Sequence, residues 1–275
     1  MDRTDRLTPI FERFPPKVRV EFADRLNGEL HIGLNEPVGH IHWLRSGTVL
    51  VQGPDAAPIV VDQPSVIFVP GPCKHRLTSD AGCELICATF DFGQRYRNPL
   101  TTLKPAIMVI PIASMAQISA LHALIMTEAF SEQCGKSMAA SQLLQYFLLV
   151  LFRHLIQTNN IPVGLLTALA DDRLLKSVTA IHRDPARAWT LEHLASVANM
   201  SRATFARRFH QVMGVTTLDY LTNWRMTVAK SLIDQGIAIK LVATQVGYAS
   251  PSALTRVFTK HAGLSPKQWA ARTSS

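Results

Sequence analysis

The stretch SRATFARRFHQVMG, residues 201–214, has a near copy later in the chain, SPSALTRVFTKHAG, residues 250–263. An offset of 49 residues (250 minus 201) aligns the two stretches and places Arg207 on Arg256. Two copies are too few for a repeat array, so the sequence indicates one duplicated motif. The aligned pairs continue beyond the quoted stretches as Val215 with Leu264, Thr216 with Ser265, and Tyr220 with Trp269.

Each copy is predicted to form two helices joined by a tight turn. Thr190 and Ser201 stand where helices would begin, and their hydroxyls can accept a hydrogen bond from a free backbone N–H. Asn199 and Gly247 stand at the two turns, and both residue types tolerate a left-handed backbone. Pro251 falls at a first helical position, which accepts proline. This order predicts two helix-turn-helix motifs.

The second helix of each motif is predicted to have a buried face and an exposed face. Phe205, Phe209 and Val212 fall on the buried side of the first copy, and Leu254 and Phe258 on that of the second. The opposite side would face DNA. The predicted DNA-binding residues are Ser201, Arg202, Ala203, Ala206, Arg207, Ser250, Ser252, Thr255 and Arg256.

Arg207 and Arg256 are the strongest candidates for reading bases. An arginine fork matches the O6 and N7 atoms of guanine, which is the commonest specific base contact. The alternatives are that these two side chains contact phosphates or stay solvated. Ala203 and Ala206 would allow close approach and could touch a thymine methyl group.

The segment between the copies, residues 217–236, has helical periodicity through Leu221, Trp224, Val228 and Leu232. About 18 helical residues span roughly 27 Å. A rod of that length could hold two recognition helices near one DNA turn apart, about 34 Å. We therefore predict that one polypeptide reads two successive major-groove faces.

The net charge of +8 is unevenly distributed. From Asp172 onward there are 14 Lys and Arg against 5 Asp and Glu, which leaves a small negative balance for the rest of the chain. A basic C-terminal region indicates a polyanionic partner, double-stranded DNA above all. A merely solvated basic surface is the alternative.

The first half of the chain has a different pattern of apolar and turn-forming residues. Up to about residue 93, short apolar runs such as TVLVQG and SVIFVP alternate with Gly, Pro and Asp, which predicts strands in a barrel or a two-sheet sandwich. Residues 115–130 and 138–157 have helical spacing. The wide apolar stripe of the second segment would either pack against the barrel or form a homodimer interface.

Residues 173–272 resemble the DNA-binding domain of the AraC/XylS family of bacterial transcription regulators. The resemblance rests on WTLEHLASVANMSRATFARRFHQVMG, YLTNWRMTVAKSLI and VATQVGYASPSALTRVFTKHAGLSP. It implies two helix-turn-helix motifs joined by a linker helix, asymmetric DNA sites, and contact with RNA polymerase during activation. The sequence departs from the family at Asn199, where glycine is usual, and at Ala203, where some members have a large side chain.

GHIHWLRSGTVLV and PSVIFVPGPCKHRL resemble the two cupin motifs of this family's sensor domains. The resemblance makes His40, His42 and His75 candidates for binding an effector or a metal ion. Three histidines can hold zinc or iron, but the glutamate of metal-binding cupins is missing. We therefore expect no resident cofactor and favour an organic effector, with ordinary polar residues of a barrel mouth as the alternative.

Cys73, Cys83 and Cys87 are candidates for a redox sensor. Such a sensor needs an accessible thiol with a low pKa and a resolving partner. Lys74 and His75 next to Cys73 would favour its thiolate, which makes Cys73 the first candidate. The alternative is that all three are buried, inert thiols.

We predict an α+β chain with a cupin-like sensor domain over residues 1–100, a helical connector over 101–170, and a DNA-binding domain over 171–275. The start of the chain has no apolar signal core, and the run FLLVLF is too short to span a bilayer, so we expect a cytoplasmic protein without membrane contact. The predicted function is a non-enzymatic transcription regulator whose DNA binding responds to a small molecule or an oxidant. The alternatives are a cupin metalloenzyme with a DNA-binding appendage and a constitutive DNA-binding protein.

Overall fold

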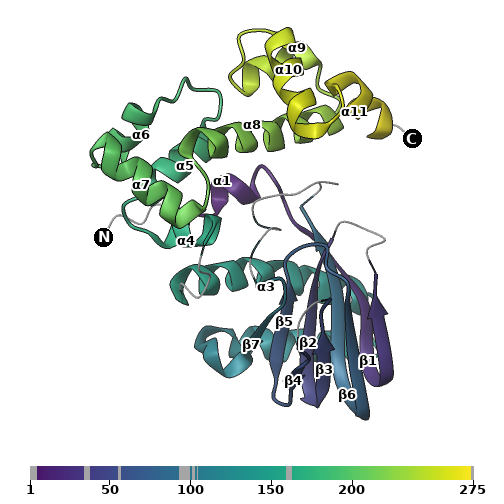
Figure 1. Cartoon of the computed structure of the whole chain (residues 1–275). Coiled ribbons are helices and arrows are strands. Elements are labelled where there is room, and N and C mark those ends of the chain that lie inside the picture. Colours follow the sequence, from purple (N-terminus) through teal and green to yellow (C-terminus); the bar gives the residue numbers. More distant parts are fainter. Residues whose placement is uncertain are drawn as a thin grey trace. The chain divides into compact units, whose positions relative to one another are not determined.

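The computed structural model describes residues 5–33, 38–54, 57–92, 100, 103, 105–158 and 163–273. The chain divides into two compact units, residues 16–161 and residues 1–15 with 162–275 (Figure 1). The sequence placed residues 1–15 with the sensor and 162–170 with the connector. The structure groups both with the C-terminal helices, because the short helix α1 (Thr8–Phe11) packs against α5 (Leu175–Arg183) and α4 (Leu165–Ala170) packs against α5 and α7 (Arg202–Met213).

The first unit is a nearly closed antiparallel β-barrel, as predicted. Its strands are β1 (Lys17–Ile32), β2 (Gly39–Gly47), β3 (Val49–Gln52), β4 (Ile59–Val61), β5 (Ser65–Val69), β6 (His75–Asp91) and β7 (Met108–Pro111). The pairing order is β4-β3-β6-β2-β5-β7, and β1 also pairs with β6. The 17 residues of β6 therefore pair with three strands, which lets one sheet wrap around a single core.

Irregular pairing bends the long strands. The register shifts between Leu26 and Gly28 on β1, and between Leu44 and Ser46 on β2. Such bulges increase local twist and help a sheet to close. The apolar side chains that the sheet encloses include Leu44, Ile67 and Leu85, none of which is exposed to solvent.

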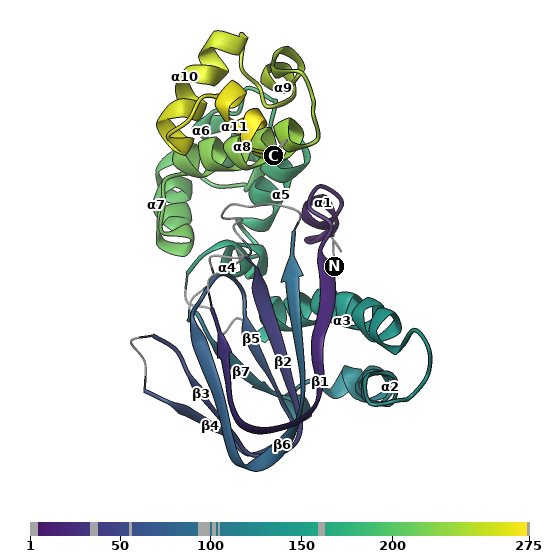
Figure 2. The same ribbon diagram turned by 90° about the vertical axis from the view of Figure 1, so that its right-hand side faces the viewer.

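Two helices lie against this barrel, α2 (Ser119–Ala129) and α3 (Lys136–Thr158) (Figure 2). Helix α3 packs on β1 and α2. The whole predicted stripe is buried within one chain, which favours internal packing and leaves that face unavailable for a dimer. Its residues are Leu144, Phe147, Leu148, Leu151, Phe152 and Leu155, at most 4% exposed.

Among the described residues, α3 is the one helix that is long and apolar enough to cross a membrane by length and composition. Half of its most apolar window is buried inside the protein. A core helix of this kind meets the same two criteria, and the packing of α3 on the barrel accounts for its apolar face.

The second unit is all helical. Besides α1, α4, α5 and α7 it contains α6 (Leu191–Val197), α8 (Thr217–Asp234), α9 (Ile239–Gln245), α10 (Pro251–Ala262) and α11 (Pro266–Thr273). The pairs α6–α7 and α9–α10 are the two predicted helix-turn-helix motifs. Helix α8 joins them and has the predicted length of 18 residues.

The turns of the two motifs adopt the predicted left-handed backbone. Asn199 has φ of 52° and Gly247 has φ of 79°. Asn199 is the one described residue other than glycine with a positive φ. At Gly247 a Cβ atom would overlap the carbonyl oxygen of Ala186, so the second turn requires glycine in addition to tolerating it.

Candidate DNA-binding surface and sensor cavity

Helices α7 and α10 both begin with a serine cap, of which the one at Ser201 was predicted. The Ser201 hydroxyl accepts a hydrogen bond from the N–H of Thr204 at 3.3 Å, and the Ser250 hydroxyl accepts one from the N–H of Ala253 at 3.2 Å. Satisfying these free N–H groups fixes where each helix starts. Both serines therefore have a structural role, which the DNA-binding prediction did not separate from contact with the nucleic acid.

The buried faces of α7 and α10 are those predicted. Phe205, Phe209, Leu254 and Phe258 are fully buried. Their burial turns the opposite face of each helix outward. Arg202, Ala203, Arg207, Ser252 and Arg256 are exposed, and Ala206 and Thr255 are half-buried.

Arg207 and Arg256 occupy equivalent positions in the two motifs. Neither side chain makes a hydrogen bond or an ion pair with any residue that the structure describes, so each guanidinium keeps all its donors for a ligand. Arg202 differs, because its Nε lies 2.9 Å from Glu192 Oε1. Both side chains of that pair are more than half exposed, so the pair contributes little stability and a phosphate could replace the carboxylate.

Thr255 and Arg208 use their polar groups inside the protein. The Thr255 hydroxyl donates to the carbonyl of Pro251 at 2.8 Å, in its own helix. That leaves its methyl group and a hydroxyl lone pair for a partner. Arg208 next to Arg207 binds the carboxylate of Asp171 through Nε at 2.9 Å and Nη2 at 2.6 Å. The two neighbouring arginines of α7 thus have different roles.

Arg225, which no sequence motif indicated, stabilises the second unit through two hydrogen bonds. Its Nε donates to the carbonyl of Pro185 at 2.8 Å and its Nη2 to that of Arg187 at 2.9 Å. These bonds tie the loop before α6 to helix α8. No local pattern in the sequence indicates the partners of Arg225.

The three histidines of the cupin motifs come together in the barrel. His42 Nε2 lies 2.7 Å from His75 Nε2, and the ring of His40 lies 5.2 Å from that of His75 between centroids. All three side chains are buried, at most 9% exposed. Burial and the neighbouring His75 lower the pKa of His40 to about 4, and burial lowers the pKa values of His42 and His75 as well. The cluster is therefore uncharged at neutral pH.

The hydrogen bonds partly resemble those of a metal site. His75 Nδ1 donates to the carbonyl of Cys73 at 2.8 Å, which places the lone pair of His75 on Nε2, where it accepts from His42 Nε2. Nevertheless, no group of three or more His, Cys, Asp or Glu side chains within the described parts of the chain is placed to hold a metal ion. Arg45 stands near the position of the missing glutamate, and its Nε lies 3.5 Å from Glu84 Oε2.

The three cysteines considered as redox sensors are buried. Cys83 and Cys87 belong to the apolar core of the barrel, and burial raises the pKa of both thiols. Cys73 is also buried, with its Sγ 3.5 Å from the carbonyl oxygen of Lys74. The expected help from His75 is absent, because its lowered pKa keeps the ring neutral. These features favour structural cysteines, whereas Cys134 is exposed.

Comparison with known proteins defines the class. A helix-turn-helix domain family matches residues 194–272, and a cupin family matches residues 5–157, which is more than half of the chain. The chain belongs to the AraC-like transcription regulators that carry an N-terminal cupin domain, and it is a DNA-binding regulator.

Two curated regulators and one solved structure are similar to this chain. The RCS-specific HTH-type transcriptional activator RclR of Escherichia coli strain K12 is 28% identical over 238 residues, covering 84% of each chain. A putative AraC-like transcription regulator of Streptomyces lividans is 32% identical over 188 residues, covering 66% of this chain and 61% of its own. The crystal structure of unsaturated fatty acid bound ToxT from Vibrio cholerae covers 93% of this chain with 16% identity and a TM-score of 0.42.

Proposed function

We propose that this regulator reads an asymmetric DNA site with its two helix-turn-helix motifs, and that a signal in the barrel modulates the binding. The observation that carries the proposal is the equivalence of Arg207 and Arg256. Each is exposed on the second helix of its motif and has no partner among the described residues. Two guanidinium groups at equivalent positions of the two motifs, each without a partner among the described residues, match the O6 and N7 acceptors of guanine in successive major grooves.

Helix α8 supports a fixed spacing between these motifs. Trp224 and Met226 are fully buried, so α8 is part of the unit's core. A buried helix of 18 residues gives a rigid separation of roughly 27 Å. A fixed separation would set the distance between the two half-sites and distinguish this mode of binding from that of two independent modules.

The signal would act through the enclosed histidine cluster of the barrel. His40 Nδ1 and His42 Nδ1 are buried without a hydrogen-bond partner among the described residues. Unsatisfied buried polar atoms are uncommon, and an organic effector with matching groups would satisfy them. In this proposal the protein activates transcription by contacting RNA polymerase, acts in the cytoplasm, and pairs as a homodimer through a surface other than the buried face of α3.

Selection of bound sequences from a random DNA library tests the proposal. The expected result is an asymmetric consensus with two information-rich blocks about one helical turn apart. Arg207→Ala should remove information from one block and Arg256→Ala from the other. A single symmetric block, or binding without a consensus, would contradict it.

Genome-wide occupancy in cells, with and without a mild oxidant or a change of carbon source, tests the regulation. Peaks that change with the signal would support a sensor. Occupancy that is identical under all conditions would favour a constitutive DNA-binding protein. Metal-dependent turnover of a substrate by the purified protein would favour the cupin metalloenzyme.

A further inference from the structure

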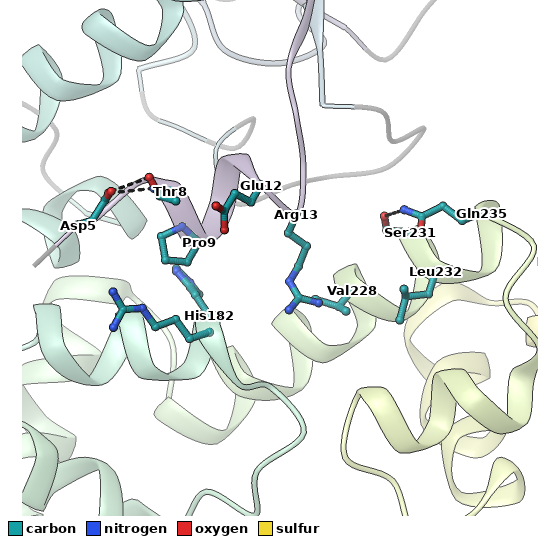
Figure 3. A pocket seen from close by; sticks show the side chains of 11 residues that line it. Asp5, Thr8, Pro9, Glu12, Arg13, His182, Val228, Ser231, Leu232 and Gln235 are labelled. Carbon is teal, nitrogen blue, oxygen red and sulfur yellow. Dashed lines mark hydrogen bonds between the residues drawn. The ribbon is translucent and has the colours of Figure 1, made fainter.

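The helical unit contains a pocket of about 600 Å³ that the DNA-binding role does not use. Residues of the N-terminal segment around α1 form one wall, and residues of α5 and α8 form the others (Figure 3). All lining residues belong to one compact unit. A volume of this size is typical of sites for small organic molecules.

The N-terminal wall is held firmly in place. Phe14 is 1% exposed, and its ring meets that of Trp224 edge-on at 5.4 Å between centroids. Arg6 Nη1 donates to the carbonyl of Leu169 at 2.9 Å. Asp5 caps the start of α1 by accepting from the N–H of Thr8 at 3.0 Å. The pocket is therefore a built feature of the unit.

Among the polar groups of the pocket, Arg13 favours a bound ligand most strongly. Its side chain is half-buried and projects into the pocket in Figure 3. It makes no hydrogen bond or ion pair with any described residue, Glu12 included. Burial lowers the pKa of Arg13, but arginine stays charged at neutral pH. An unpaired, partly desolvated guanidinium is unfavourable until an anion binds it.

Further polar groups line the same pocket. His182 is one of them, and its Nε2 lies 2.6 Å from the Tyr220 hydroxyl. Burial raises the pKa of Tyr220 and lowers that of His182 to about 3, so both groups are neutral at pH 7. His182 Nδ1 has no partner among the described residues. On α8, the Gln235 amide donates to the Ser231 hydroxyl at 3.3 Å, which leaves the hydroxyl proton for a ligand.

We propose that this pocket binds a small organic monocarboxylate, with the carboxylate paired to Arg13 and an apolar part against Pro9, Val228 and Leu232. The planar guanidinium matches a carboxylate with two parallel hydrogen bonds. Arg183, Asp5 and Glu12 also line the pocket, so the two positive charges are balanced by two negative ones. This balance favours a singly charged ligand over a phosphate dianion.

The regulatory role of this pocket rests on the proposed function, to which it adds a class of ligand. A ligand here would touch both the segment around α1, which leads directly into β1, and α8, which carries the two DNA-binding motifs. A ligand that binds the folded unit stabilises it by mass action. It would thus favour the arrangement in which the N-terminal segment rests on α8.

Binding can be tested on the full chain by calorimetry and thermal unfolding with hexanoate, benzoate and, as an uncharged control, hexanol. Hexanoate or benzoate should bind and raise the melting temperature, and hexanol should not. Arg13→Gln should weaken binding at least about tenfold. Lys17→Gln, which removes an exposed charge that does not line the pocket, should bind like the wild type. Arg13→Lys, which keeps the charge but loses the fork, should fall between the two.

Several results would overturn the proposal: no binding of either carboxylate, equal binding by Arg13→Gln, or equal binding of inorganic phosphate. If Arg13→Gln does not fold, Arg13→Lys decides, and unchanged binding by that variant would count against a bidentate contact. DNA binding of Arg13→Gln without any carboxylate should match the wild type. This last measurement separates failure of the pocket from failure of the DNA-binding proposal.

Discussion

The ring of Phe258 meets the ring of Trp269 edge-on, with centroids 5.7 Å apart and planes at 83°. In the first motif the equivalent rings of Phe209 and Tyr220 lie 5.8 Å apart at 62°. The duplication seen in the sequence is therefore also a duplication of core packing. Each motif uses one aromatic pair to attach its recognition helix to the helix that follows.

Phe258→Ala should destabilise the second motif by about 3–5 kcal/mol, because a fully buried phenylalanine leaves a cavity when truncated. Urea unfolding followed by tryptophan fluorescence, in a background where Trp43, Trp189 and Trp224 are replaced by phenylalanine so that Trp269 alone reports, measures this loss. Phe258→Leu, which keeps most of the volume, should cost clearly less. Equal and small losses for both variants would place Phe258 outside the core.

Gly247→Ala should cost more than about 1 kcal/mol, because the positive φ strains any side chain and the added Cβ meets the carbonyl of Ala186. Asn199→Gly is the matched control at the equivalent turn. It should change the free energy of unfolding by only a few tenths of a kcal/mol. Thermal melts of both variants provide the comparison, and a harmless Gly247→Ala would contradict the turn geometry.

The buried His40 predicts loss of stability in acid. Its pKa of about 4 in the folded protein lies below the unfolded value of 6.5, so the unfolded chain binds the proton first as the pH falls. The contribution of His40 to the free energy of unfolding is complete above pH 6.5 and declines between pH 6.5 and 4, by about 2 kcal/mol at pH 5. Urea unfolding at pH 7 and pH 5 measures the decline.

His40→Asn should reduce this pH dependence, and the buried His42, His75 and His182 should account for the remainder. His31→Asn, which alters an exposed histidine of β1, should preserve it. A wild-type protein equally stable at pH 7 and pH 5 would show that His40 is not desolvated in the folded barrel.

The four thiols should react at very different rates with an aromatic disulfide reagent. Cys134 is exposed and should be modified within the first phase. Cys83 and Cys87 are buried with raised pKa values, so their modification should await unfolding. Cys134→Ser should abolish the fast phase. A fast phase that survives this substitution would return Cys73 to consideration as a redox sensor.

Local patterns predicted the parts of the fold that local chemistry controls. The caps at Thr190 and Ser201, the turn at Asn199 and the buried aromatic residues of the motifs all follow from neighbouring residues. Helix α3 was placed well, but its apolar stripe could not by itself distinguish packing on the barrel from packing on a second subunit.

Long-range relationships could not be predicted from the sequence. Nothing near Phe14 indicates that it packs against Trp224, because the two residues are separated by more than two hundred positions. The same holds for the pairing of Arg208 with Asp171, because these two residues are 37 positions apart. The pocket around Arg13 follows from these distant contacts.

The most direct measurement is the affinity of Arg256→Ala and Arg208→Ala for the selected DNA site and for versions with each base pair changed in turn. Both variants lose one positive charge, but only Arg256 is on the exposed face without a partner. We predict that Arg256→Ala loses about 1–3 kcal/mol and its discrimination at one base pair, while Arg208→Ala keeps the full sequence preference. Equal weakening on every sequence by Arg256→Ala would contradict base reading and assign Arg256 to the phosphate backbone.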